Sequence, residues 1–316
     1  MAVERKSTSA TLWLVLLVVG LSSVLPLLWI VMGSFKPHKQ IQGGDVWPWQ
    51  KYGVYQQEAA PTSQPSTAPA QPTAAAEPAR EPQPTSLERL SLDNYRRVFK
   101  QMAGLPTYYF NTLYLAFAGT FLSLLVGTLA AYGFAQFNFR GHKLLFALLL
   151  LELMIPGEVT LIGRIELMLQ LRLFDTLTGL LIAYVAGNLL LVIFIMRNVF
   201  TSIPREVIHA AQIDGASTWQ VFWEVMIPMG RNGLAACAIL TFLAIWNEFI
   251  FALTFTSGDR VRTLPVGIYM LRDQYGLVNS GVLFATVLLS FLPIVIMFIL
   301  LQRYFVRGLA SGALKA

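Results

Sequence analysis

The chain has 316 residues, of which 55% are hydrophobic and only 13% are charged. A typical soluble domain carries about 25% charged residues, so the composition excludes an ordinary soluble globular protein and indicates a chain surrounded by membrane lipid. The formal net charge is +6, but the basic residues are distributed among the segments that flank the apolar runs, so this charge does not indicate a nucleic-acid partner.

Six apolar runs are long enough to cross the hydrocarbon layer when they are read in windows of about 20 residues. They are residues 11–31, 112–134, 144–162, 177–196, 234–255 and 283–301. The first run lacks a small-residue cleavage site before Lys36 and is expected to remain as an anchor. The third contains Glu152, and Pro156 is expected to kink it or to end it early. The predicted fold is an all-α integral membrane protein with six transmembrane helices.

The connection between the first two runs, residues 34–111, is unusually long. Its part at residues 59–86 holds seven of the chain's 16 prolines, together with many Ala, Gln, Thr and Ser residues, and such a composition cannot bury a core. We expect this insert to be an extended, disordered and passive linker on the outer side; a capture arm for a substrate or partner is the alternative. The chain thus divides into 1–33 with the first helix, the outer segment 34–111, and a core of five helices at 112–316.

Orientation follows from the positions of the Lys and Arg residues, none of which lies within the six runs. With the N-terminus inside, the cytoplasmic segments hold ten of them and the two short outer loops hold five. Cytoplasmic loops carry the excess of basic residues, so both termini are predicted to be cytoplasmic, as are residues 198–230. The five basic residues of the outer loops are Arg164, Arg172, Arg260, Arg262 and Arg272.

A polar stretch at residues 203–228, called here the 203–228 segment, predicts a helix, a turn and a second helix between two apolar runs. Pro204 favours the start of the first helix, because its missing N–H would be unpaired there. Gly215 favours the end of that helix, since glycine accepts the left-handed backbone that commonly follows a helix. Ser217 and Gln220 have the spacing of a capping box for the second start. The pattern is typical of a rigid docking surface.

The 203–228 segment resembles the cytoplasmic EAA loop of ABC-importer permeases, the element that docks into a cleft of the ATP-hydrolysing subunit. The resemblance implies that residues 198–230 couple this chain to an ABC ATPase dimer. His209 stands where the family usually has Glu, so a charged contact made by that Glu is here absent or pH-dependent, since histidine titrates near neutrality. The residues to which the resemblance gives the coupling role are Pro204, Glu206, His209, Ala210, Ala211, Asp214, Gly215, Ala216 and Phe222.

Four further stretches resemble the carbohydrate branch of the same family, the maltose-type second permease subunits. They are residues 110–113, 156–175, 246–249 and 263–267. The resemblance implies an all-helical permease half in the bacterial cytoplasmic (inner) membrane. It also implies a second permease subunit, an ABC ATPase dimer, an extracytoplasmic solute-binding protein and a sugar substrate as partners.

Polar groups inside the runs are the candidates for a translocation path, because a charge in hydrocarbon is costly and usually faces protein or water. Carboxylate and amide groups can hydrogen-bond the hydroxyls of a sugar, and an aromatic ring offers a stacking face. The alternative is that these groups bond neighbouring helices and hold the bundle together. The candidates are Glu152, Asn188, Trp246, Asn247 and Glu248.

The chain lacks the residues that ATP hydrolysis or metal chemistry would need. It has no G-x-x-x-x-G-K-[ST] loop to hold phosphates, so we expect a transport subunit rather than an enzyme, with ATP used by the partner ATPase and no cofactor bound by this chain. The three histidines, His38, His142 and His209, lie outside the runs without metal-ligand spacing. No metal site is therefore predicted.

Two alternatives to a sugar importer stay open at this point. A closely similar permease can import glycerol phosphate or another polyol, but an anionic cargo favours a Lys or Arg facing the path, and the six runs contain none. A neutral mono- or oligosaccharide is therefore preferred. An ATP-independent channel or secondary transporter would need a filter loop, an inverted repeat or charges in several spans, and it would leave the 203–228 segment unexplained.

Overall fold

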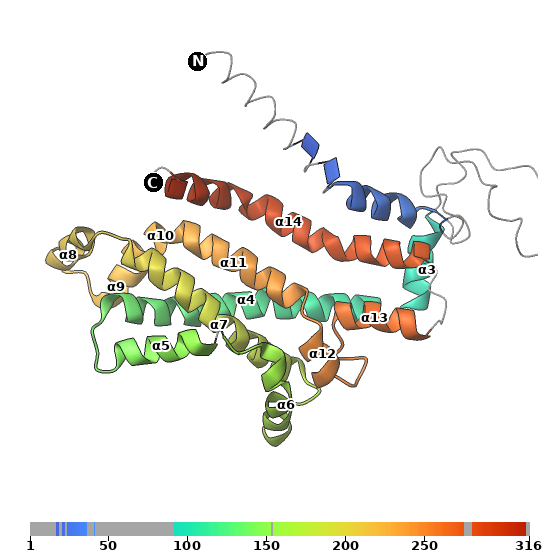
Figure 1. The fold of residues 1–316 in the computed structure, drawn as a ribbon, viewed down its shortest axis with the longest axis horizontal. Coiled ribbons are helices and arrows are strands. Elements are labelled where there is room, and N and C mark those ends of the chain that lie inside the picture. Colours follow the sequence, from blue (N-terminus) through green and yellow to red (C-terminus); the bar gives the residue numbers. More distant parts are fainter. Residues whose placement is uncertain are drawn as a thin grey trace, which may run out of the picture. The chain divides into compact units, whose positions relative to one another are not determined.

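The structure of the chain, a computed structural model, describes residues 17–18, 21–22, 24–36, 41, 92–152, 154–274 and 280–313 (Figure 1). Within these ranges every regular element is a helix, so the predicted all-α class is confirmed for the part of the chain that the structure describes. The predicted linker at residues 59–86 and the start of the first apolar run, residues 11–16, lie outside the described residues.

Helices and short connections alternate from residue 93 to residue 313. The elements are α3 (Asp93–Gln101), α4 (Leu105–Gln136), α5 (His142–Glu152), η1 (Gly157–Thr160), α6 (Leu161–Gln170), α7 (Leu177–Thr201), α8 (Arg205–Ile213), α9 (Thr218–Gln220), η2 (Val221–Met226), α10 (Ile227–Met229), α11 (Arg231–Trp246), α12 (Ile250–Phe255), α13 (Leu264–Gln274) and α14 (Ser280–Ala313).

Within the described residues, three helices are by themselves long and apolar enough to cross a membrane: α4, α7 and Ser280–Leu300 of α14. Two bent pairs of helices raise the number to five if each pair is one span. A shorter apolar helix, Val24–Ser34, covers the end of the first predicted run. These helices support the membrane character of the chain, whereas the count of six spans and the cytoplasmic position of both termini stay predictions.

Two of the predicted runs are broken rather than continuous. In the run 144–162, α5 ends at Glu152 before Pro156, and α5 and Gly157–Gln170 are bent by 95°, so the expected effect of the proline is confirmed. The prediction of one continuous helix over residues 234–255 is wrong, because α11 ends at Trp246 and α12 begins at Ile250. The physical reason is Glu248, which lies between the two helices. Its carboxylate accepts hydrogen bonds from the N–H groups of Phe251 and Ala252 in the first turn of α12, as a helix cap does.

The chain divides into two compact units, the first of which comprises residues 1–101 and 274–289. In its described part, the buried Asn94 of α3 donates two 2.8 Å hydrogen bonds to the carbonyls of Ser34 and Lys36, where the first apolar helix ends. A Cβ atom on Gly281 would lie 2.5 Å from Asn94 Nδ2, so the start of α14 comes too close for a side chain. α3 is thereby fixed to the ends of two apolar helices.

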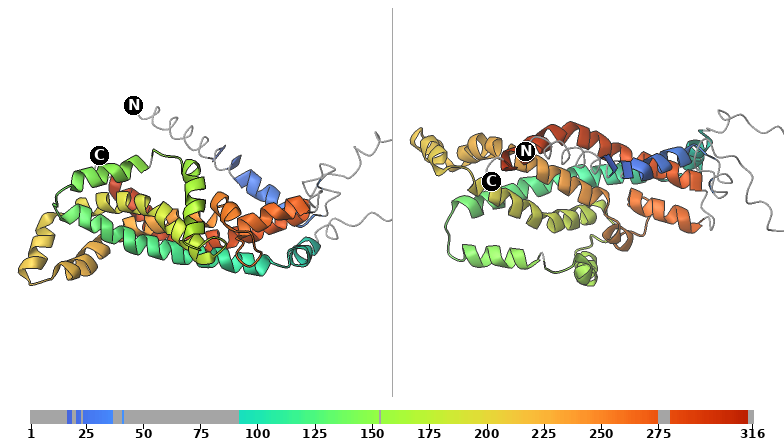
Figure 2. Two further views of the ribbon diagram at one scale, coloured as in Figure 1. Left: turned by 90° about the horizontal axis from the view of Figure 1, so that it is seen from below. Right: turned by 45° about the horizontal axis from the view of Figure 1, so that its top comes forward.

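The second unit, residues 102–273 and 290–316, contains α4, α7 and α11, which pack side by side (Figures 1 and 2). Small residues on α4 permit this close packing. A Cβ atom on Gly127 would lie 2.6 Å from Val192 Cγ1 of α7, and one on Gly119 would lie 2.7 Å from Ile245 Cδ1 of α11. The 203–228 segment lies in the chain between α7 and α11, and Asn247 and Glu248 follow α11 directly.

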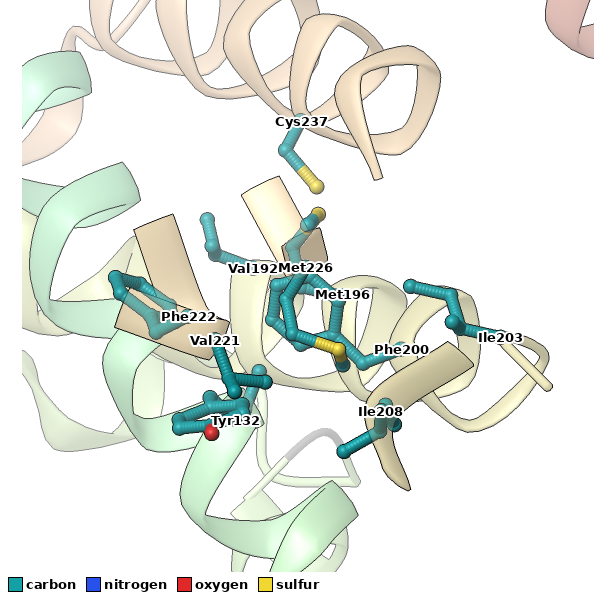
Figure 3. Packing of buried hydrophobic residues seen from close by; sticks show 11 residues of the cluster. Tyr132, Val192, Met196, Phe200, Ile203, Ile208, Val221, Phe222, Met226 and Cys237 are labelled. Carbon is teal, nitrogen blue, oxygen red and sulfur yellow. The ribbon is translucent and has the colours of Figure 1, made fainter. Parts of the chain in front are cut away.

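A hydrophobic cluster, called here the segment cluster, lies where the 203–228 segment meets these helices (Figure 3). The fully buried ring of Phe222 has its centroid 5.1 Å from that of Tyr132 in α4 and 6.5 Å from that of Phe200 in α7. The Tyr132 hydroxyl also donates to Thr218 O at 3.1 Å. The second helical stretch of the segment is therefore fastened to two spanning helices. The buried members are Ala131, Tyr132, Val192, Met196, Phe200, Ile203, Ile208, Val221, Phe222, Met226 and Cys237.

Truncation of the central ring tests this packing. Phe222→Ala should lower the stability of the purified full chain in detergent by about 3–5 kcal/mol, the usual cost of deleting a buried aromatic side chain. The matched control is Trp223→Ala, because Trp223 is the next residue but is 43% exposed, so its truncation should cost much less. The midpoint of thermal unfolding measures both. Equal losses would contradict the central position of Phe222.

Candidate functional site

The 203–228 segment folds as the sequence predicts at its helix boundaries. Pro204 directly precedes α8, and the chain leaves α8 through Gly215, whose φ of +86° lies in the left-handed region. Beyond its two chain neighbours, no atom of the described residues lies within 4 Å of a Cβ built on Gly215, so the backbone conformation alone requires glycine there. Ser217 and Gln220 form the predicted capping box, with reciprocal bonds of 2.8 and 3.3 Å. The helix-turn-helix is confirmed, whereas its coupling role stays a prediction.

The second helix of the segment departs from a regular α-helix, which the sequence analysis does not predict. Residues Val221–Met226 form the π-helix η2, in which Ile227 N donates to Phe222 O, five residues earlier. Pro228 follows directly and has no N–H to donate to the carbonyl of Glu224. This gap in the α-helical series of hydrogen bonds accompanies the wider π turn, and Phe222 within it is a buried member of the segment cluster.

Of the residues with a predicted coupling role, most are exposed, two are half-buried and one is buried. Phe222 is fully buried, so it holds the segment in place and presents no surface to a partner. Large apolar side chains that the sequence analysis does not select join the exposed set, above all Ile213, which is 86% exposed, and Trp219. The exposed members are Pro204, Glu206, His209, Ala210, Asp214 and Gly215, and the half-buried ones are Ala211 and Ala216.

Three of the five residues predicted to line a path lie at one break in the helices, and a fourth lies one turn after Tyr184, whose hydroxyl bonds Glu248 at that break. Trp246 ends α11, Asn247 and Glu248 connect it to α12, and Asn188 lies on α7, which contacts α12. The fifth, Glu152, is exposed at the end of α5 and shares no hydrogen bond with the other four within the described residues. The structure therefore groups the candidates on α7 and α11 and leaves Glu152 outside that group.

The carboxylate of Glu248 organises this break. Its Oε1 accepts a 2.8 Å bond from Phe251 N, and its Oε2 accepts bonds of 3.0 Å from Ala252 N and 2.7 Å from the Tyr184 hydroxyl. The two backbone N–H groups open α12 and have no partner within that helix. Both carboxylate oxygens thus serve the fold, which favours the alternative that Glu248 holds the helices together. Tyr184, which the sequence analysis does not select, ties the break to α7.

The other polar groups at the break are less fully engaged. Trp246 is buried, and its ring stacks on that of Phe242 with centroids 5.8 Å apart. The Nδ2 atoms of Asn188 and Asn247 each donate to the carbonyl four residues earlier, at 2.8 and 2.9 Å. Their amide oxygens have no partner among the described residues. Asn188 and Asn247 are therefore the groups that can still accept a hydrogen bond from a sugar hydroxyl.

A further set of contacts fixes the loop between α12 and α13. Asn111 of α4 donates from Nδ2 to the carbonyls of Arg260 and Arg262, at 2.9 and 2.8 Å. On the other side, Asp175 Oδ1 accepts a 2.7 Å bond from Ser257 N. Asn111 and Asp175 lie within the stretches that resemble a family, and neither is predicted to make these contacts. An isolated polar residue at the end of an apolar helix could have marked both residues as candidates. The sequence does not indicate their hydrogen-bond partners, which are more than 80 residues away.

The chain is similar to known proteins. The family model described as binding-protein-dependent transport system inner membrane component matches residues 123–311, which include the 203–228 segment and the break after Trp246. An arabinooligosaccharides transport system permease protein of Halalkalibacterium halodurans is 34% identical over 226 residues, which are 72% of this chain and 80% of the relative. A trehalose/maltose transport system permease protein of Thermococcus litoralis is 35% identical over 227 residues, which are 71% and 81%.

A solved structure has the same fold. It is the crystal structure of a bacterial ABC transporter involved in the import of the acidic polysaccharide alginate, and one of its chains aligns with a TM-score of 0.69. The alignment covers 95% of this chain and 97% of that chain at 20% identity. At this identity the likeness concerns the fold alone.

Substitutions at the break rank its hydrogen bonds. Glu248→Gln should destabilise the purified chain by about 1.5–3 kcal/mol, because a primary amide cannot accept bonds at both ends and a charge-assisted bond is lost. Tyr184→Phe removes one of the three bonds and should cost less. Glu152→Gln, on an exposed carboxylate, is the control and should cost little. The midpoints of thermal unfolding rank the destabilisation caused by the three substitutions. If Glu152→Gln lowered the midpoint as much as Glu248→Gln does, the proposed role of Glu248 would be contradicted.

Proposed function

The chain belongs to the family of binding-protein-dependent transport system inner membrane components, and from this premise we propose that it is a permease subunit of an ATP-driven importer whose cargo is a sugar. The cargo class follows the names of the relatives, which are transport systems for arabinooligosaccharides and for trehalose and maltose. The observation that carries the proposal is the 203–228 segment, which is exposed on one side and fastened to spanning helices on the other.

The exposed side of this segment is the proposed contact with an ABC ATPase dimer. Ile213 and Trp219 present large apolar side chains on either side of the turn at Gly215, and in an aqueous loop such side chains are expected to be covered by a partner protein. The small, exposed Ala210 permits close approach along α8. His209 lies on the same helix and is exposed, so its side chain can contact the partner as well.

The buried side of the segment is the proposed route by which ATPase closure moves the spans. Ile208 of α8 and Phe222 of η2 belong to the same cluster as side chains of α4, α7 and α11. A short helix is not stable alone in water, so these contacts hold the segment in shape. A push on α8 is therefore expected to rotate the helices and to exchange inward-facing and outward-facing states.

The cargo is proposed to pass at the break between α11 and α12, with the amide oxygens of Asn188 and Asn247 available to sugar hydroxyls. Six spans with both termini in the cytoplasm, a second permease subunit and an extracytoplasmic solute-binding protein complete the proposed importer in the bacterial inner membrane. This chain binds no cofactor in the proposal, and ATP is used by the partner. Neutral oligosaccharides and glycerol phosphate or other polyols are the cargo classes to compare.

Affinity purification of the tagged full chain from its native cells tests this assignment. We expect a second permease subunit and an ABC ATPase to co-purify, and we expect ATP hydrolysis to rise when one sugar of a panel is added with its binding protein. Ile213→Ser should reduce the amount of ATPase recovered, because it removes an apolar contact of the exposed surface. Recovery of the chain alone after gentle extraction would contradict an importer and favour an ATP-independent channel or secondary transporter.

The matched control for that variant is Leu171→Ser. Leu171 is also an exposed large apolar residue, but it lies between α6 and α7 and not in the 203–228 segment. Its replacement should leave recovery of the ATPase unchanged. Equal loss of the ATPase in both variants would assign the effect to general instability rather than to docking.

The turn at Gly215 provides a test of transmission. Gly215→Val forces a β-branched residue into the left-handed region, at a cost of about 1–2 kcal/mol, so in the assembled complex sugar-stimulated hydrolysis should no longer drive normal uptake. Gly133→Val is the control, because a Cβ there also meets no atom within 4 Å but the backbone is that of an ordinary helix. Wild-type uptake per ATP in an assembled Gly215→Val complex would refute the rigid turn as part of the transmission.

A further inference from the structure

Arg164 of α6 reaches two other helices of the second unit. Its guanidinium carbon lies 5.1 Å from the centroid of the Phe251 ring in α12. Its Nη1 lies 4.0 Å from the position that a Cβ atom on Gly187 of α7 would occupy. Arg164 is predicted from the sequence to lie in an outer loop beyond the apolar runs. The structure instead places its charged end against two helices that belong to those runs.

The contact with Gly187 gives the depth of this charge. α7 is one of the helices long and apolar enough to cross a membrane, and it runs from Leu177 to Thr201. Gly187 lies ten residues after Leu177, which is about 15 Å along the helix at 1.5 Å per residue. The guanidinium group therefore lies near the middle of a spanning helix. A charged group at that depth is expected to face protein or water rather than lipid.

No carboxylate in the described part of the chain pairs with Arg164. The ion pair found there joins Arg262 and Asp259. Glu248 lies three residues before Phe251, but its two oxygens accept bonds from two backbone N–H groups and from the Tyr184 hydroxyl. The Phe251 ring attracts a cation more weakly than an anion would. The charge of Arg164 is thus left without an anionic partner from this part of the chain.

We propose that Arg164 binds the anionic group of an acidic sugar, a carboxylate or a phosphate, as the cargo passes the break between α11 and α12. A guanidinium group presents parallel N–H donors that match two oxygens of such a group. Gly187 leaves room beside it, because, apart from its chain neighbours and its own helix backbone, Arg164 Nη1 is the one atom of the described residues within 4 Å of a Cβ built there. Asn188, the next residue of α7, supplies an amide oxygen for a hydroxyl of the same sugar.

This inference rests on the proposed function and narrows its cargo. The preference for a neutral sugar depends on the absence of basic residues from the six apolar runs. Arg164 lies outside those runs in the sequence, but α6 follows a 95° bend, and its side chain reaches the middle of α7. The lack of basic residues in the runs is therefore no longer a reason to prefer a neutral cargo. The position of Arg164 favours an anionic sugar instead.

Chemical modification of the purified full chain tests the site without knowledge of the natural cargo. Phenylglyoxal reacts with free guanidinium groups, and mass spectrometry follows the modified peptide that contains Arg164. Galacturonate or inorganic phosphate should slow modification of Arg164 severalfold, whereas galactose, which lacks the carboxylate, should not. Protection by galacturonate alone identifies a carboxylate site, and protection by phosphate alone identifies a phosphate site. Either result supports the proposal.

Arg172 is the internal control, because it is an exposed arginine two residues after α6. Its modification should proceed at the same rate in all three solutions. The proposal is overturned if neither anion protects Arg164, if galactose protects it as well as galacturonate does, or if Arg172 is protected to the same extent. The last outcome would show a general effect of the anion rather than a site.

Transport by the reconstituted complex gives the second test. Arg164→Gln should lower uptake of galacturonate oligosaccharides or of a sugar phosphate about tenfold, the order expected for one charge-assisted contact, with no change in thermal stability, and Arg164→Lys should restore part of it. An equal loss for neutral sugars, or unchanged uptake of acidic ones, would overturn this inference while the importer assignment stands. Absence of ATP-driven uptake of every sugar would instead overturn the proposed function.

Discussion

The burial of Phe222 against the rings of α4 and α7 is the interaction on which the rest of the structure depends. Full burial of a side chain of this size contributes about 1.5–3 kcal/mol, and the bond from Tyr132 to Thr218 O fixes the adjoining backbone. The same cluster includes Ile208 of α8 and Cys237 of α11. The exposed face of the 203–228 segment is therefore connected to three packed helices by close contacts, which is the property that a coupling element needs.

The membrane imposes a second constraint, because a backbone group in hydrocarbon must find its partner within the protein. The break between α11 and α12 meets this requirement through Glu248, whose oxygens bind the first free N–H groups of α12. The acidic side chain is thus used for the fold, while the amide oxygens of Asn188 and Asn247 and the guanidinium of Arg164 are the groups that we propose to meet a cargo. Polar residues close together at one break therefore have different tasks.

The helix boundaries of the 203–228 segment were predictable from the sequence, whereas contacts between distant parts of the chain were not. Pro204, Gly215 and the Ser217–Gln220 pair each act within one turn of helix, so the boundaries of the 203–228 segment follow from them. The depth of Arg164 and the bond from Tyr184 to Glu248 depend on other helices. The π-helix and the break after Trp246 have local causes, Pro228 and Glu248, but these residues act on backbone hydrogen bonds that a hydropathy pattern does not describe. Hydropathy alone also treats residues 234–255 as one span, because it measures only how apolar the residues are. It does not show that the Glu248 carboxylate accepts bonds from backbone N–H groups and so separates two helices. The functional roles rest on family membership and on these contacts together.

Uptake into proteoliposomes tests the central claim, that ATP hydrolysis by a partner drives a sugar past this chain. The vesicles would contain the purified complex, with ATP on the side of the 203–228 segment and a radiolabelled sugar with its binding protein on the other. We expect the sugar to accumulate against its gradient with ATP and not with a non-hydrolysable analogue. Equilibration of the sugar at the same rate with and without ATP would contradict it.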